Sequence, residues 1–264
     1  LDSATAKRVG PGLTADFAAG GLYIYDGNTR LTTGRTLNAT SHEAVFGGLN
    51  LSIDPGAMKH LMIVADVSGA AGGGNVNAFQ LSALTASGVT ATGTPLSGPN
   101  FTMSTAAVGG VTTAVSSTPA NPKAGEMGVK IASFSLAAAA AEDITLNKLT
   151  LTYSGSMNRD YLSNLVLKQS GSALATVAGI SSKDLVTFVL ATPYKLERGS
   201  TRVFEVYGDV SGSARPGTDT IKVYIDQTSD VLAIGSVYGY GVRVPTNGYN
   251  SAGAPTLTVA GGTL

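Results

Sequence analysis

Apolar and polar residues alternate along most of the chain, in short segments separated by Gly, Pro, Asp and Ser. Side chains of a β-strand point alternately to the two faces of a sheet, so this pattern predicts half-buried strands. Turn pairs such as Asp26-Gly27 and Pro55-Gly56 are typical of connections between antiparallel strands. An all-β fold is therefore expected. The predicted strands cover residues 21–28, 49–54, 60–67, 77–84, 100–104, 129–136, 144–154, 164–169, 185–190, 201–210 and 220–227.

One run, LAAAAAED at 136–143, has the composition of a helix, because Ala has the highest helix propensity. It is short and lies between two strand patterns. Isolated helices of this length are not stable in water. We therefore expect an irregular or single-turn connection at this point.

An internal repeat organises the chain. A shift of 143 positions places residues 51–69 on residues 194–212 without a gap, and both segments end in Asp-Val-Ser-Gly. A constant shift that preserves a turn glycine and a four-residue loop indicates two copies of one β-domain. The aligned apolar pairs include Leu61 with Phe204 and Ile63 with Val206.

The two copies differ at their beginnings. Before its strand at 164–169, the second copy has two strand patterns, at 129–136 and 144–154. Before its strand at 21–28, the first copy has only residues 1–20, which are Gly-rich and lack a strand pattern. The first domain is therefore predicted to be incomplete.

The end of the chain resembles an earlier segment. GAPTLTV at 253–259 matches GPNFTM at 98–103, and each follows the end of a repeat. We interpret the tail as the first strand of a third domain that the chain does not complete. The predicted organisation is an incomplete sandwich at 1–98, a second sandwich at 99–252, and a protruding strand at 253–264.

Four segments resemble the tandem immunoglobulin-like β-sandwich repeats of secreted bacterial surface-layer and filament proteins. They are the strand at 22–27, the strand pairs at 53–69 and 196–212, and the strand at 255–264. The resemblance implies immunoglobulin-like antiparallel sandwiches with a role on the cell surface or in a filament. The chain departs from the pattern in its incomplete first copy.

Charge and composition exclude several partners. Lys+Arg and Asp+Glu both number 17, so no basic field is present to hold nucleic acid or an anionic membrane. No run reaches the ~18 apolar residues of a membrane-spanning helix. The absence of Cys excludes disulfides and thiolate metal sites. A low-charge surface rich in Ser, Thr, Gly and Ala leads us to expect an extracellular or cell-surface protein.

Catalysis is not expected. The only histidines are His42 and His60, which we expect in ordinary surface or strand positions. No Gly-x-Ser-x-Gly segment lies between a predicted strand and a predicted helix, so the sequence lacks the nucleophile elbow that holds the catalytic serine of α/β-hydrolases. The glycine clusters lack the spacing of nucleotide-binding loops, and no cofactor is expected.

Five aspartates are the candidate calcium ligands. Calcium takes six to eight oxygens from converging groups, and no EF-hand or nonapeptide spacing is present. The alternative is that Asp66 and Asp209 cap their own turns through backbone amides. This second interpretation predicts no metal. The five residues are Asp66, Asp209, Asp219, Asp226 and Asp230.

Two further groups of residues are candidate surface features. Tyr238, Tyr240 and Tyr249 lie in a Gly-rich stretch and could belong to a packed loop, a subunit interface or a sugar-binding site. The glycosylation pattern Asn-x-Ser/Thr occurs three times, either as glycan attachment sites or by chance. These asparagines are Asn38, Asn50 and Asn100.

The functional hypothesis from the sequence is head-to-tail self-assembly into an extracellular filament or surface layer. The tail of one subunit would enter the first domain of the next, burying Leu257 and Val259 while Thr256 and Thr258 face outward. Leu264 ends this predicted donor strand. Deletion of 253–264 would then leave soluble monomers. The alternatives are a piece of a larger multidomain surface protein or adhesin, and a carbohydrate-binding module.

Overall fold

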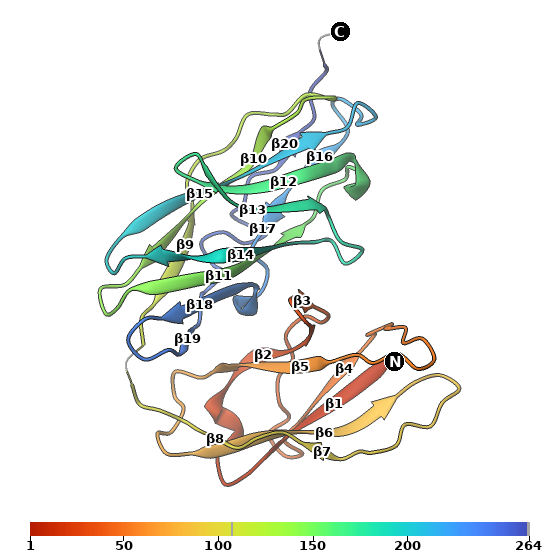
Figure 1. Cartoon of the computed structure of the whole chain (residues 1–264), viewed down its shortest axis with the longest axis vertical. Helices are drawn as coiled ribbons and strands as arrows, with labels where there is room; N and C mark the ends of the chain where they lie inside the picture. Colours follow the sequence, from red (N-terminus) through yellow and green to blue (C-terminus); the bar gives the residue numbers. More distant parts are fainter. Residues whose placement is uncertain (107, 263–264) are drawn as a thin grey trace. The chain divides into compact units, whose positions relative to one another are not determined.

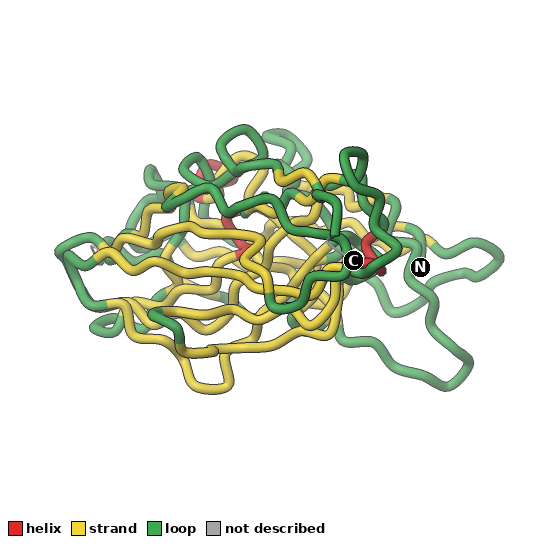
Figure 2. Tube along the Cα trace, turned by 90° about the horizontal axis from the view of Figure 1, so that it is seen from above, coloured by secondary structure: helices red, strands yellow, loops and turns green. Residues whose placement is uncertain are grey.

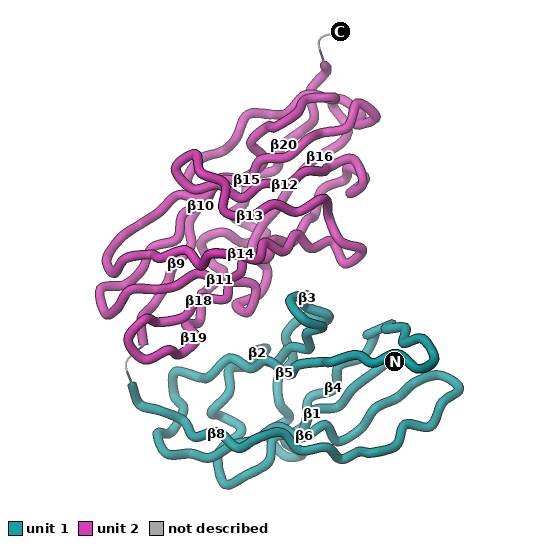
Figure 3. Tube along the Cα trace, in the orientation of Figure 1, with its two compact units in different colours: residues 1–106 teal, residues 107–264 magenta. Residues whose placement is uncertain are grey.

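The computed structural model describes residues 1–106 and 108–262, so Leu264 lies outside the described residues. The chain divides into two compact units, Leu1–Ala106 and Ala107–Leu264 (Figure 3). Strands dominate both, and the only helical segments in the described ranges are single 3-10 turns (Figure 2). The all-β prediction is confirmed, and every strand pairing is antiparallel except one parallel bridge between Lys123 and Ala260. The immunoglobulin-like assignment stays a prediction.

Unit 1 is built from two antiparallel sheets (Figure 1). The first has the strand order β4-β1-β6-β7, with β8 also paired to β6, and the second has the order β3-β2-β5. The 3-10 turn η1 (Thr14–Asp16) connects the two sheets. The strands are β1 (Ser3–Val9), β2 (Phe17–Asp26), β3 (Thr29–Arg30), β4 (Glu43–Gly47), β5 (Leu61–Val67), β6 (Val76–Thr85), β7 (Leu96–Ser97) and β8 (Phe101–Thr102).

Unit 2 has the larger set of strands. One sheet has the order β13-β12-β15-β10-β9, a second has β14-β11-β18-β19 with β17 also on β11, and β16 pairs with β20. The strands are β9 (Val111–Val115), β10 (Val129–Ala138), β11 (Ile144–Tyr153), β12 (Leu162–Gln169), β13 (Ser172–Gly179), β14 (Leu185–Leu196), β15 (Thr201–Val210), β16 (Thr220–Ile221), β17 (Val223–Tyr224), β18 (Val231–Gly235), β19 (Gly241–Val242) and β20 (Leu257–Thr258). The 3-10 turns are η2 (Arg159–Tyr161) and η3 (Thr228–Asp230).

The Ala-rich run at 136–143 is an irregular connection, as expected. Its first residues complete β10, which ends at Ala138, and β11 begins at Ile144. Residues 136–138 continue the strand because every second side chain of β10, including Phe134 and Leu136, is buried on the inner face of the sheet. Tertiary burial outweighs the helix propensity of alanine here.

The core of unit 2 lies between its two sheets, which makes this unit a β-sandwich. Phe134 and Phe204 extend from one sheet and Leu149 and Phe188 from the other, and all four are fully buried. Phe134 also packs on Tyr249, with ring centroids 4.9 Å apart. Each such aromatic contributes a large apolar area to the core.

Strand pairing repeats between the units with the same shift of 143 residues. β2 pairs with β5 as β12 pairs with β15, residue for residue over the apolar part of the strands. The matching pairs are Tyr23–Val64 with Val166–Tyr207, Ile24–Ile63 with Leu167–Val206, and Tyr25–Met62 with Lys168–Glu205. The internal repeat is therefore structural as well as sequential.

The prediction that residues 1–20 contain no strand is wrong. Residues 3–9 form β1, which lies between β4 and β6 in its sheet. β11 has the same place in unit 2, with β14 on one side and β17 and β18 on the other. Ala4, Ala6 and Arg8 point inward and are buried. The pattern was missed because the inward residues are small or charged; Arg8 is accommodated by donating to Asn77 Oδ1 (3.1 Å).

The prediction that the tail protrudes is also wrong. β20 pairs with β16 of its own unit, and Leu257 and Val259 are 1% and 0% exposed. Its sequence match, Phe101–Thr102, pairs with β6 and belongs to unit 1, so the boundary falls after 106 and not after 98. Both segments are last strands of the unit they follow. The alignment found the right pair of segments but assigned each to the wrong domain.

Candidate functional site

The closing strands of the two units are held by similar pairs of backbone hydrogen bonds. In unit 2, Gly217 N donates to Val259 O and Val259 N donates to Asp219 O, both at 2.8 Å. In unit 1, Gly74 N donates to Met103 O (2.9 Å) and Met103 N donates to Asn75 O (2.8 Å). Met103 and Val259 therefore occupy equivalent places. The predicted donor strand is a structural part of unit 2.

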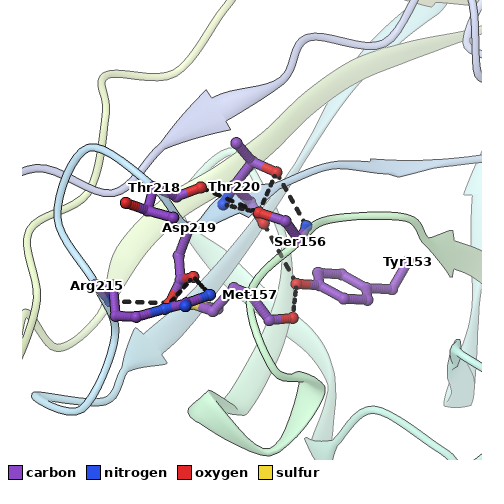
Figure 4. A network of polar contacts seen from close by, with 7 residues as sticks. All are labelled: Tyr153, Ser156, Met157, Arg215, Thr218, Asp219 and Thr220. Carbon is purple, nitrogen blue, oxygen red and sulfur yellow. Dashed lines mark hydrogen bonds and ion pairs between the residues drawn. The ribbon is translucent and has the colours of Figure 1, made fainter.

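A network of polar contacts fixes the turn that holds this tail in unit 2 (Figure 4). The carboxylate of Asp219 is 1% exposed and accepts from Arg215 Nη2 (2.7 Å), Nε (3.0 Å) and backbone N (2.8 Å). These hydrogen bonds from Arg215 hold the pKa of Asp219 below its usual value. Ser156 Oγ lies 3.1 Å from Thr220 Oγ1, and Tyr153 Oη donates to Thr220 O (3.3 Å). The network therefore positions the strand that receives β20.

Unit 1 fixes the same turn with a different set of residues. The carboxylate of Asp16 is 1% exposed and accepts from Asn77 Nδ2 (2.9 Å), Asn75 Nδ2 (2.8 Å), Leu13 N (2.9 Å) and Gly72 N (3.2 Å). Burial of the carboxyl raises its pKa, but these hydrogen bonds outweigh burial and lower the pKa of Asp16 to about 2. The charged form of Asp16 therefore stabilises unit 1.

We expect this carboxylate to make unit 1 sensitive to acid. The pKa of Asp16 is lower in the folded chain, about 2, than the ~3.9 of an unfolded aspartate. Its contribution is therefore complete above about pH 5 and is lost as the pH falls toward 2. Hydrogen exchange of β6 at pH 6 and pH 3 measures the loss, and Asp16→Asn should show a smaller difference between the two. An equal difference in both proteins would contradict this role.

The candidate site is the edge of β5 that faces away from β2. In unit 2 the equivalent strand, β15, is paired on both sides, by β12 and by β10. In unit 1, β5 is the last strand of its sheet, and none of the described residues forms a strand on its outer side. The two units therefore differ by the counterparts of β10 and β9. An unpaired edge exposes backbone N–H and C=O groups that can bind another strand.

The side chains of β5 are less buried than those of β15. Phe204 and Val206 are 0% and 1% exposed, whereas their counterparts Leu61 and Ile63 are only partly buried. Val67 is 50% exposed, although its counterpart Val210 is 2% exposed. Complete burial of an exposed apolar side chain stabilises by about 1.5–3 kcal/mol, and these partly buried side chains would gain a fraction of that each. The apolar face of β5 is therefore incompletely covered.

β5 is also shorter than β15. β15 starts at Thr201, and its first three residues pair only with β10, because pairing with β12 stops at Phe204. β5 starts at Leu61, the counterpart of Phe204. The preceding residues 58–60 are exposed and outside any strand. β5 therefore lacks the three residues at its start that, in β15, pair only with β10.

A depression of about 360 Å3 lies at this end of β5. Its lining is mostly apolar and includes Met58 and Met62, which are 77% and 48% exposed. Lys59 Nζ and Asp26 Oδ2 form an ion pair of 2.8 Å at its border. Methionine side chains adapt to varied apolar partners, so this end of the edge is suited to receive side chains of another segment.

Asp209 does not cap its own turn, as one interpretation predicted, and Asp66 accepts from Tyr23 Oη (3.3 Å). Asp209 accepts from Gly128 N and from Asn164 Nδ2, both at 2.7 Å, and these bonds lower the pKa of Asp209. Gly128 directly precedes β10, so Asp209 attaches the start of that strand to β15. The turns are capped instead by Ser68 and Ser211, whose hydroxyls accept from the amide two residues later.

The other candidate ligands and the histidines lie in local structural contacts. Asp230 is fully buried and accepts from Gln227 N (2.9 Å), and Asp226 accepts from Gln227 Nε2 (2.7 Å). His42 Nδ1 lies 2.6 Å from Thr14 Oγ1, and His60 borders the depression beside β5. Within residues 1–106 and 108–262, no three His, Asp or Glu side chains converge to hold a metal.

The tyrosine loop divides into a buried and an exposed part. Tyr249 is 1% exposed and packs in the core of unit 2, which agrees with the packed-loop alternative and not with a place in an interface or sugar site. Tyr238 and Tyr240 are 52% and 47% exposed, with stacked rings 6.4 Å apart. Glu142 holds the loop by accepting from Val237 N (2.8 Å). The sequon residues Asn38, Asn50 and Asn100 are all exposed, and their glycosylation stays a prediction.

No helix among the described residues has the length and apolar composition to cross a membrane. No protein-family model and no curated protein matches the sequence.

Two solved structures are weakly similar to the chain. One is described as "Putative membrane anchored protein from Corynebacterium diphtheriae", with 10% identity and a TM-score of 0.26 over 98% of this chain and 59% of the other. The second is a family 123 glycoside hydrolase from Clostridium perfringens, with 10% identity and a TM-score of 0.25 over 60% of this chain and 28% of the other. The chain thus spans less than two thirds of either protein, and at these TM-scores neither match shows a shared fold.

Proposed function

We propose that this chain is a non-catalytic structural subunit of an extracellular, cell-surface assembly, and that another polypeptide completes its first unit by adding a strand to β5. The observation that carries the proposal is the difference between two copies of one domain. β15 has β10 at its outer edge, and β5 has no strand there within the described residues. Strand addition supplies affinity through main-chain hydrogen bonds and specificity through alternate side chains.

Strand donation by the tail is not part of this proposal. Leu257 and Val259 are buried in their own unit, and Ala260 N also donates to Pro122 O (2.7 Å). Release of the tail would expose these side chains and leave β16 without its partner. Each strand of the described residues has a place in its own unit, so none of them is free to occupy the outer edge of β5.

The extracellular location rests on composition. The chain has no cysteine, only 13% charged residues and a balanced charge, with Gly, Ser, Thr and Ala in its turns. Addition of a strand from another polypeptide to β5 would link this subunit to a neighbour through main-chain hydrogen bonds, which fits a structural role.

A photo-cross-linking amino acid at position 62 tests the proposal in the cells that make the protein. Met62 lies on β5, and Val45, 58% exposed on β4, is the matched control because β4 is an edge in unit 1 as β14 is in unit 2. We expect a cross-link at position 62 to an extended segment of another polypeptide, and none at 45. Loss of the protein's signal when intact cells are treated with protease checks the surface location. Equal labelling at both positions would contradict strand addition, and protection from protease would contradict the location.

A further inference from the structure

Unit 2 shows what kind of strand fits the β5 edge, because β10 occupies the equivalent edge of β15. β10 runs antiparallel to β15, with Phe134 opposite Phe204 and Ala132 opposite Val206. These four side chains are buried in the core. Leu61 and Ile63 are the counterparts of Phe204 and Val206 under the shift of 143 residues. A strand that binds β5 in the same register therefore has its inward residues opposite Leu61 and Ile63.

From this register we infer that the β5 edge binds an antiparallel strand with the alternation of β10, but with an apolar or uncharged residue where β10 carries Lys130. The inference rests on the proposed function and specifies its partner. A slip of one residue would turn the apolar side chains outward, so the register is strongly determined by the open face of unit 1.

The residue expected in place of Lys130 follows from the side chains on the outer faces of β15 and β5. In unit 2, Lys130 Nζ forms a partly buried ion pair with Glu205 Oε1 (2.8 Å), and Glu205 raises the pKa of this lysine. The counterpart of Glu205 in unit 1 is Met62, and the counterpart of Tyr207 is Val64. A lysine at this position would have Met62 in place of the carboxylate with which Lys130 pairs in unit 2. The two edges therefore select different strands.

Docking also extends β5 toward the N-terminus. Residues 201–203 of β15 are strand residues because β10 pairs with them. Their counterparts at 58–60 lie beside the apolar depression formed by Met58 and Met62. In the transferred register, the counterpart of Leu136 lies opposite Lys59, as Leu136 lies opposite Arg202 in unit 2.

Synthetic peptides of residues 127–138 test the inference on the full-length chain. We expect the Lys130→Val peptide to bind about fivefold or more tightly than the unchanged peptide, and an Ile131→Asp peptide to bind about tenfold or more weakly. A peptide of the tail, residues 253–264, serves as the competing occupant. Equal affinity of the Lys130→Val and unchanged peptides, or tighter binding of the tail peptide, would overturn the inference.

Disulfide cross-linking fixes the register, since the chain has no cysteine of its own. In the transferred register, Met62→Cys lies opposite a Ser133→Cys peptide, and Val64→Cys lies opposite a Lys130→Cys peptide. We expect at least fivefold more product from these matched pairs than from the exchanged pairs. More product from the exchanged pairs would show a parallel strand and overturn the inference. A cross-link at position 62 in cells without binding of these peptides would overturn the inference and leave the proposed function standing.

Discussion

A chain in which residues 127–145 are placed directly before Leu1 should have a markedly more stable first unit. β1 is the counterpart of β11, and each strand is followed within two residues by a glycine, Gly10 or Gly155, where a Cβ would meet a backbone carbonyl of the neighbouring strand. Counting back from these glycines places Leu1 on Leu146. The added residues therefore reproduce β10 and its connection to the next strand.

We expect this addition to raise the free energy of unfolding of unit 1 by at least about 2 kcal/mol, the contribution of one large apolar side chain that becomes buried. For a unit of this size, that corresponds to an increase of about 8–16 °C in its melting temperature. Calorimetry of the full chain measures the change, and hydrogen exchange assigns each transition to a unit. The added strand should also prevent cross-linking from position 62 to other polypeptides, because the edge is occupied.

The matched control carries Ile131→Asp and Phe134→Asp in the added copy only. It has the same length and connection but places charge on the inward face of the strand, where burial is unfavourable. We expect it to leave the melting temperature of unit 1 unchanged. If both extended chains melt at the same temperature, the edge of β5 is not the place of the missing strand.

Leu257→Ala should destabilise unit 2 by about 3 kcal/mol, as large-to-small substitutions in a packed core do. Leu257 is 1% exposed in a strand that pairs with β16. Val259→Asp should have a larger effect, about 4 kcal/mol or more, since it places a carboxylate at a fully buried position. Urea unfolding of the purified monomer, followed by hydrogen exchange of β16, measures both effects.

Thr256→Ala is the control for this pair, because Thr256 is exposed in the same segment. We expect a change within about 0.5 kcal/mol for it. If Leu257→Ala were as mild as Thr256→Ala, the tail would not be part of unit 2 in solution. The earlier hypothesis of a freely available donor strand would then regain support.

The sequence predicts the fold class and the repeat well, because both depend on local patterns. Alternation of apolar residues marks the strands, and the shift that aligns Leu61 with Phe204 also describes how these strands pair. The missing β10 counterpart is likewise visible in the sequence, as the strand pattern at 129–136 that has no match in the first copy.

The wrong predictions concern segments whose place in the fold is set by contacts with residues far away in the sequence. β1 has Ala4, Ala6 and Arg8 on its inward face, a pattern that only a neighbour such as Asn77 explains. The tail has a strand pattern, but the pattern does not say which sheet it joins; Gly217 and Asp219 decide that through backbone hydrogen bonds. Tyr249 lies in a Gly-rich stretch typical of a surface loop, yet its contact with Phe134 places it in the core.

The open edge of β5 can be identified only when the sequence repeat and the structure are compared. Leu61 and Ile63 are ordinary apolar positions by sequence, and only the comparison of their exposure with that of Phe204 and Val206 shows that a neighbour is missing. Met58 and Met62 gave no signal in the sequence, since isolated methionines carry no pattern. The comparison of the two repeats in sequence points to the missing strand, and the pairing of β10 with β15 shows which edge it leaves open.

Hydrogen exchange of β5 measures whether its outer edge is open. In the dilute full-length chain, we expect amides of residues 61–67 that point away from β2 to exchange rapidly. Amides of residues 204–210 should be protected throughout, because β15 is paired on both sides. Addition of the Lys130→Val peptide of residues 127–138 should slow the rapid amides of β5 by at least about tenfold. Protection of β5 equal to that of β15 without the peptide, or no change on adding it, would contradict the account.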